Sequence, residues 1–112
     1  MREADRDPLR IQHMIESINR VNDFMADKSE KDLENNSMLF YAVVKNIEII
    51  GEAAYKLTHE FMDSHPEIPW KQIIRMRHIL VHGYYQINTE QLYNVYTEDL
   101  PYLYAKLLKC SL

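Results

Sequence analysis

The feature that most constrains the fold of this chain is a repeat of apolar side chains, at intervals of three and four residues, between Leu39 and Leu57. It comprises Leu39, Ala42, Val43, Ile47, Ile50, Ala53, Ala54 and Leu57, with the polar Asn46 at one position of the same repeat. This spacing predicts a long amphipathic helix over residues 37–62, whose apolar face other helices must cover. Gly51 lies in the middle of that helix, where it costs up to about 1 kcal/mol relative to alanine. We therefore expect another helix to approach closely there.

Three further segments show helical periodicity, over residues 7–25, 70–82 and 88–108. The first is predicted to start with Asp7 as N-cap and Pro8 at the first helical position, which is a favoured pairing. Pro101 lies inside the last segment and should bend or locally break it. The polar stretch over residues 27–37 is predicted to connect two helices and can hold a short extra helix near residues 29–33.

Composition supports an all-α fold. The 112 residues include only two glycines and four prolines, too few for the frequent turns of an all-β protein. We predict an up-down bundle of four main helices that forms one domain over residues 1–112. Cys110 is the only cysteine, so no internal disulfide can form. The charged N-terminus resembles no signal peptide and no apolar run is long enough for a membrane span, so we expect a cytoplasmic protein.

The charge of the chain is unevenly distributed. Residues 68–89 contain no Asp or Glu, while Lys71, Arg75 and Arg77 contribute +3, which leaves −7 for the remainder of a chain whose net charge is −4. A local basic patch on an acidic protein suits one phosphate-bearing ligand better than a long nucleic-acid groove. A chance cluster on a solvated face is the plain alternative.

Arg77 and His82 lie in this basic stretch and could cleave RNA together. Five residues apart on a helix, they differ by about 140° in direction but lie within about 8 Å along the axis. Imidazole can take the proton of a 2′-hydroxyl or give one to a leaving 5′-oxygen. Guanidinium can hold the phosphate in a bidentate manner and stabilise developing charge. Purely structural roles, such as a histidine that stabilises a helix C-terminus, remain an alternative.

Three linked motifs resemble those of HepT-like HEPN proteins. Residues 76–84 (MRHILVHGY) resemble the Arg-x4-His-x-Tyr motif of that family, carried here by Arg77, His82 and Tyr84. Residues 46–54 (NIEIIGEAA) resemble its Ile-Gly-Glu-Ala helix, and residues 66–70 (PEIPW) its Pro-x-x-Pro-Trp segment. Residues 99–101 match the last helix of the family, so the resemblance covers nearly the whole chain.

The resemblance implies a function. HEPN toxins are helical homodimers that cleave RNA without a metal or cofactor, at a cleft where two copies of the motif meet. It implies phosphate contact for Arg77, acid–base chemistry for His82, and modification for Tyr84. The implied partner is a nucleotidyltransferase antitoxin of the MntA type, which attaches AMP to that tyrosine in a type VII toxin–antitoxin system. An RNA substrate is expected, and neither DNA nor a membrane.

One position departs from the family pattern. The residue after the motif arginine is commonly small and polar, whereas here it is His78, which either supplies a hydrogen-bonding group or alters activity. The alternative function is therefore a non-catalytic dimeric helical adaptor that docks a nucleotidyltransferase or binds a nucleotide. His78 and His82 also have the spacing of two metal ligands, but no third ligand lies nearby in sequence, so we expect no metal.

Other residues could support the site. Asn46, inside the apolar stripe, could satisfy a buried polar group or face the cleft, and Arg75 adds charge to the basic stretch. Glu48 and Glu52 share a helix face and could pair for acid–base work, although solvated or interface carboxylates are the commoner outcome.

Overall fold

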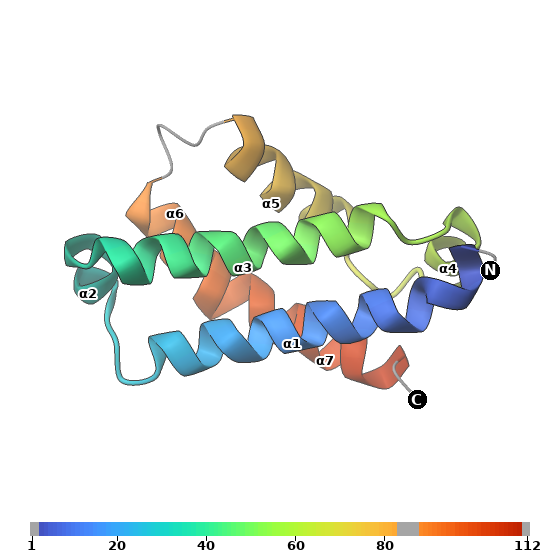
Figure 1. The fold of residues 1–112 in the computed structure, drawn as a ribbon, viewed down its shortest axis with the longest axis horizontal. Helices are drawn as coiled ribbons and strands as arrows, with labels where there is room; N and C mark the ends of the chain where they lie inside the picture. Colours follow the sequence, from blue (N-terminus) through green and yellow to red (C-terminus); the bar gives the residue numbers. More distant parts are fainter. Residues whose placement is uncertain (1–2, 83–87, 111–112) are drawn as a thin grey trace.

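The chain folds into an antiparallel bundle of helices (Figure 1). The computed structural model describes the backbone of residues 3–82 and 88–110 and the side chains of residues 5–78 and 88–110. All regular structure in these ranges is helical, which confirms the predicted all-α bundle with four long helices. The elements are η1 (Glu3–Arg6), α1 (Asp7–Met25), α2 (Glu30–Asn35), α3 (Ser37–Tyr55), α4 (His59–Ser64), α5 (Trp70–His82), α6 (Thr89–Asn94), η2 (Val95–Asp99) and α7 (Leu100–Cys110).

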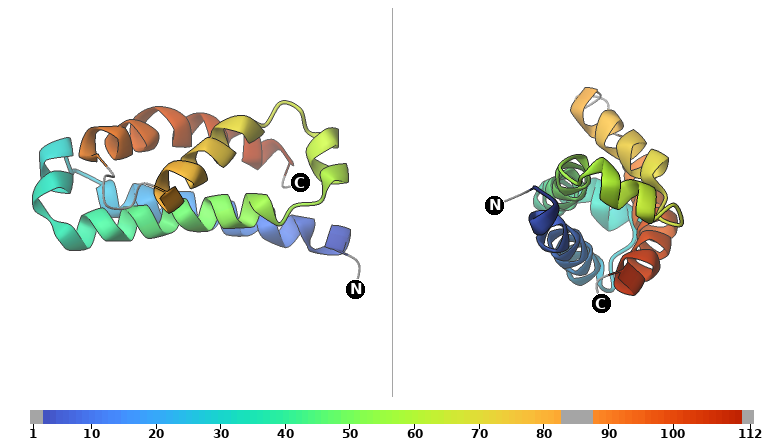
Figure 2. Two further views of the ribbon diagram at one scale, coloured as in Figure 1. Left: turned by 90° about the horizontal axis from the view of Figure 1, so that it is seen from above. Right: turned by 90° about the vertical axis from the view of Figure 1, so that its right-hand side faces the viewer.

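The long helices surround one apolar core. Helix α1 packs along α3, α3 packs on α5, and α7 closes the bundle against α1 (Figures 1 and 2). The C-terminal end of α5 diverges from the other helices in both figures. The most completely buried large side chains are Ile11, Met14, Ile18, Met25, Leu33, Ile47, Ile50, Ile68, Ile73, Leu92, Leu100 and Leu103. Except for Leu33 and Ile68, they come from the four periodic segments of the sequence, so the periodicities that predict the helices also predict most of the core.

The prediction of one continuous helix over residues 37–62 is wrong beyond Tyr55. Helix α3 ends at Tyr55, and α4 begins at His59 after Thr58, whose hydroxyl accepts a hydrogen bond from the Phe61 amide at 3.1 Å. Thr58 therefore acts as an N-cap, a role that requires non-helical backbone at that residue. The interruption turns the chain and carries α4 across the end of the bundle (Figure 1).

Asp7 explains why Thr58 holds this position. Its carboxylate accepts hydrogen bonds from the Thr58 amide at 3.1 Å and from the Thr58 hydroxyl at 2.7 Å. The prediction that Asp7 caps its own helix is therefore wrong: Arg6 occupies the N-cap position without a side-chain cap, and Asp7 is only 4% exposed. The carboxylate ties the start of α1 to the junction between α3 and α4.

The short extra helix is present as α2. Ser29 is its N-cap, and the Ser29 hydroxyl accepts a hydrogen bond from the Asp32 amide while the Asp32 carboxylate accepts one from the Ser29 amide. Because this reciprocal capping box satisfies two backbone donors at once, a helix of six residues can form between α1 and α3.

The last helical segment is interrupted near Pro101, as predicted. Helix α6 passes into the π-helical segment η2, and α7 follows with Pro101 as its second residue. The Leu100 amide donates to the carbonyl of Val95, five residues earlier. Leu92, Leu100, Leu103 and Leu107 are buried in the core, whereas Leu108 is 43% exposed.

Within the described ranges, the helices are too short or too polar for any of them to cross a membrane.

Replacing Asp7 should destabilise the bundle. Asp7→Ala leaves the amide and hydroxyl of Thr58 without their acceptor in a largely buried position, which should cost about 1–3 kcal/mol of unfolding free energy. Denaturant unfolding measures the loss. Asp23→Ala, which removes an exposed carboxylate from the other end of α1, is the matched control and should change stability by less than about 0.5 kcal/mol. Equal effects of the two substitutions would contradict the assigned role.

Candidate functional site

The site is built where α3 and α5 cross at Gly51. A Cβ atom added to Gly51 would lie 2.7 Å from the Cβ of Arg77, 3.1 Å from its Cγ and 3.3 Å from its Cδ. Real Cβ atoms are not found this close to other atoms, so the missing side chain of Gly51 makes room for the Arg77 stem. This confirms the close helix approach expected at Gly51.

The guanidinium of Arg77 is held by two residues of α3. Its Nη2 lies 3.4 Å from Oε1 of Glu52, and its Cζ lies 4.8 Å from the centre of the Tyr55 ring. The Arg77 side chain is 32% exposed, so its stem is covered while its head reaches solvent. The buried Nε has no hydrogen-bond partner among the described residues. The guanidinium is thus oriented by the protein while donors remain for a ligand.

The contact with Glu52 is weak enough to be exchanged. It is one ion pair at 3.4 Å between side chains that are 32% and 45% exposed. Such partly exposed pairs contribute about 0–1 kcal/mol, whereas a bidentate contact between arginine and an oxyanion is stronger. A phosphate could therefore replace Glu52 at Arg77. Glu48 lies 3.9 Å from Lys45, so the two carboxylates do not form the pair considered from the sequence.

Arg75 lies in a different environment from Arg77. Burial raises the pKa of Asp99, and the positive charge of Arg75 partly opposes that rise while Glu98 adds to it. Asp99 also accepts a hydrogen bond from Gln72 at 2.7 Å. Arg75 therefore balances the charge of Asp99 on the side of α5 that faces η2, and the structure does not bring it to Arg77.

The other candidate residues are only partly placed. Asn46 is 7% exposed on α3, and its Nδ2 donates to the Ala42 carbonyl at 2.9 Å. Its buried Oδ1 has no hydrogen-bond partner in the described part of the chain. His78 is exposed on α5, directly after Arg77. The His82 side chain and all of Tyr84 lie outside the described residues. Among the residues that the structure describes, no group of three histidine, cysteine or acidic side chains could hold a metal ion.

Sequence reasoning missed Tyr55 as a partner of Arg77 and did not connect Glu52 with it. Both follow Gly51 within about one turn of α3. A helix that packs closely on Gly51 must pass beside the side chains on either side of that glycine. Gly51, the one signal that predicts a close approach, could therefore have pointed to Glu52 and Tyr55 as neighbours.

The fold and site define a small helical bundle that presents a partly exposed arginine where two helices cross. Residues 14–110 match the family described as Ribonuclease HepT-like, and this chain belongs to that family.

Two relatives match most of this chain over most of their own length. A protein of Methanocaldococcus jannaschii named a putative RNase is 38% identical over 88 residues, which are 79% of this chain and 81% of that protein. A protein of Thermococcus cleftensis named probable ribonuclease HepT is 32% identical over 99 residues, 88% of this chain and 90% of that protein. No solved structure matches the chain significantly.

Gly51→Ala should be destabilising, although alanine is the better helix former by about 1 kcal/mol. The new methyl group would meet the Cβ of Arg77, which cannot move without its helix, so we expect a net loss of about 1–3 kcal/mol in unfolding free energy. In an Arg77→Gly background the obstacle is gone, and the same substitution should become stabilising. Denaturant unfolding of the four proteins tests this. The same loss in both backgrounds would rule out the assigned packing.

Proposed function

We propose that this protein is a metal-independent endoribonuclease that acts as a homodimer on RNA in the cytoplasm. The observation that carries the proposal is the guanidinium of Arg77, which is oriented by Glu52 and Tyr55 and whose buried Nε has no hydrogen-bond partner in the described part of the chain. Membership of the HepT-like ribonuclease family and relatives named as RNases support it.

Arginine and histidine suffice for the reaction. One His82 imidazole removes the proton of the 2′-hydroxyl, whose oxygen attacks the adjacent phosphorus. The bond from phosphorus to the 5′-oxygen breaks, and a second imidazole, from the other subunit, gives a proton to that oxygen. The products are a 2′,3′-cyclic phosphate and a 5′-hydroxyl. Arg77 holds the phosphate and stabilises the negative charge that grows on its oxygens.

A homodimer is supported by the surface of α3. Met38, Tyr41 and Tyr55 are 85%, 65% and 71% exposed, and their spacing puts them on the same helix face as Glu52. Large exposed apolar side chains are typical of surfaces that bind another protein. A second copy on this face would lie close to Arg77, as a shared active site requires.

Regulation is proposed to act on Tyr84. A nucleotidyltransferase antitoxin of the MntA type would transfer AMP to the Tyr84 hydroxyl, with release of pyrophosphate from ATP. The added phosphate carries negative charge, so it would compete with RNA for Arg77, seven residues earlier in the sequence.

Substitutions at Arg77 and His82 test the enzyme. Arg77→Ala and His82→Ala should each reduce RNA cleavage at least about a hundredfold, because each removes a group that acts on the reacting phosphate. Cleavage of a labelled RNA and growth inhibition on expression are the measurements. Arg20→Ala, which removes an exposed arginine of α1, is the matched control and should cleave like the parent protein. Cleavage that survives both active-site substitutions would refute the mechanism.

The modification is tested by mass spectrometry after co-expression with a nucleotidyltransferase of the MntA type. We expect AMP on Tyr84 and loss of RNA cleavage, and a Tyr84→Phe protein should escape neutralisation because it lacks the acceptor oxygen. Neutralised protein without a modified Tyr84 would contradict this regulation.

The alternative is a non-catalytic dimeric adaptor that docks a nucleotidyltransferase or binds a nucleotide. The two hypotheses predict different outcomes when the chain is expressed alone. The enzyme should stop growth and cut RNA in an Arg77-dependent manner, whereas the adaptor should be harmless.

A further inference from the structure

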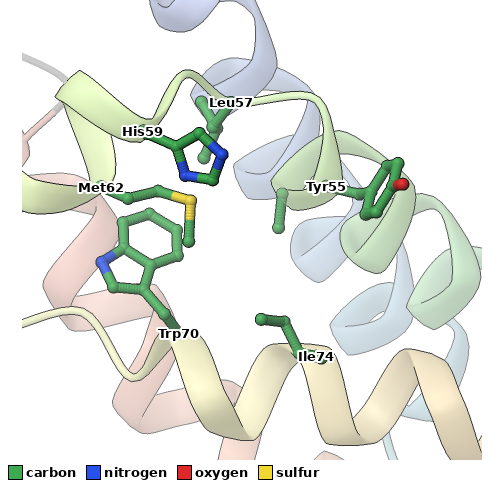
Figure 3. Close-up of a pocket in the computed structure, with 7 residues that line it drawn as sticks. Tyr55, Leu57, His59, Met62, Trp70 and Ile74 are labelled. Carbon is green, nitrogen blue, oxygen red and sulfur yellow. The ribbon is translucent and has the colours of Figure 1, made fainter.

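A pocket of about 460 Å³ lies next to the Arg77 site and shares Tyr55 with it (Figure 3). It is enclosed by the end of α3, the α4 segment and the first turns of α5. Its lining residues are Ala54, Tyr55, Leu57, His59, Met62, Trp70 and Ile74. Since Ile74 precedes Arg77 by about one turn of α5, the pocket and the guanidinium are neighbours on both helices.

Trp70 forms a fixed apolar wall of this pocket. Its Nε1 donates a hydrogen bond to the His65 carbonyl at 2.9 Å, and its ring meets the Phe61 ring edge to face, with centres 6.3 Å apart. In Figure 3 the indole nitrogen points away from the open space, and the Tyr55 ring lies on the opposite side of it. Because its only polar group is already satisfied, Trp70 offers the pocket a flat surface that needs no further hydrogen bond.

The pocket opens to solvent on a side where large lining side chains are exposed. Tyr55 is 71% and Ile74 56% exposed, and His59 is exposed as well. Apolar surface of this kind, next to a few polar groups, is typical of ligand sites, whose volumes are about 300–1,000 Å³. The volume here falls in that range.

We propose that this pocket binds a nucleobase of the RNA whose phosphate contacts Arg77. The inference deepens the proposed ribonuclease function and rests on it. Aromatic side chains stack on any base, because every base has a π face, and RNA-binding proteins use them for unpaired nucleotides. Tyr55 connects the two subsites, since the residue lines the pocket and its ring contacts the guanidinium.

The neighbouring charge favours a nucleotide over a side chain from a second copy. The guanidinium of Arg77 contacts Tyr55, which lines the pocket, and the Arg77 side chain is partly exposed, so an occupant with an attached anion gains a contact that an apolar side chain cannot make. His59 adds a ring whose nitrogens can hydrogen-bond the edge of a base. The pocket would hold one unpaired base beside the phosphate that is cut.

Trp70 reports binding directly, because it is the only tryptophan of the chain. The purified wild-type chain is titrated with each of the four nucleoside monophosphates, with ribose 5-phosphate and with inorganic phosphate, while tryptophan fluorescence is followed. Nucleoside monophosphates should quench it to saturation. Ribose 5-phosphate should bind at least about tenfold more weakly, the difference expected from one stacked base. Equal responses to nucleotides and to ribose 5-phosphate would overturn the proposal.

Two substitutions of exposed lining residues locate the effect. Ile74→Glu places a carboxylate in the pocket that a bound base would have to desolvate, and His59→Ala removes one ring of its wall. Both should weaken nucleotide binding, whereas the matched control Leu9→Glu, which puts the same charge on an exposed apolar residue of α1, should bind like the parent. If Ile74→Glu breaks the dimer but neither substitution changes nucleotide affinity, a second copy fills the pocket and the proposal is wrong.

The result is separable from the proposed activity. Arg77→Ala should keep the quenching by a base and lose only the gain that the phosphate provides, so nucleoside and nucleotide should then bind equally. If RNA cleavage depends on Arg77 and His82 while nucleotides leave Trp70 unaffected, the ribonuclease stands and the base subsite is refuted. If nucleotides bind but the chain cuts no RNA, the base pocket stands and the ribonuclease falls.

Discussion

The close packing of Arg77 on Gly51 is the constraint on which the rest of the site depends. Without a side chain on Gly51, α5 can cross α3 near enough for the arginine stem to lie against the α3 backbone. The guanidinium then arrives between Glu52 and Tyr55 at the surface. A larger residue at position 51 would push α5 away from α3. The residues of these two helices that line the pocket would then move apart. The position of the charge is thus set by backbone packing, and the weaker contacts only refine it.

Two buried polar atoms near this crossing lack partners among the described residues, Nε of Arg77 and Oδ1 of Asn46. Each such atom costs about 1–3 kcal/mol when it is withdrawn from water without a hydrogen bond. Natural folds keep few of them, and those that persist call for an explanation. Both belong to residues singled out from the motifs, and both lie on the two helices that build the site. A third such atom among the described residues, Nε of Arg10, lies on α1. Two of the three unmet hydrogen bonds are therefore on the helices that build the site.

The sequence predicts the features that depend on local pattern. Helix spacing, the short helix α2 and the disturbance at Pro101 all follow from residues within a few positions of one another. The end of α3 does not follow from local pattern, because Thr58 is held by Asp7, which lies 51 residues earlier in the sequence. The partners of Arg77 are likewise on another helix. Residues two apart on a helix differ by about 200° in direction, so the sequence does predict that Arg75 faces away from Arg77. It does not predict that Arg75 lies near Asp99, which is on another helical segment.

The π-helical segment between α6 and α7 settles which leucines reach the core. Leu92 and Leu100 are eight residues apart, which in a regular α-helix would turn them about 80° away from each other. The wider turn over Val95–Asp99 absorbs about one residue, so both side chains are buried in line with Leu103. A relative with one residue fewer in this segment could straighten it into continuous α-helix and keep the same core. The loss of a single residue should therefore be tolerated better at this point than inside the regular α-helices.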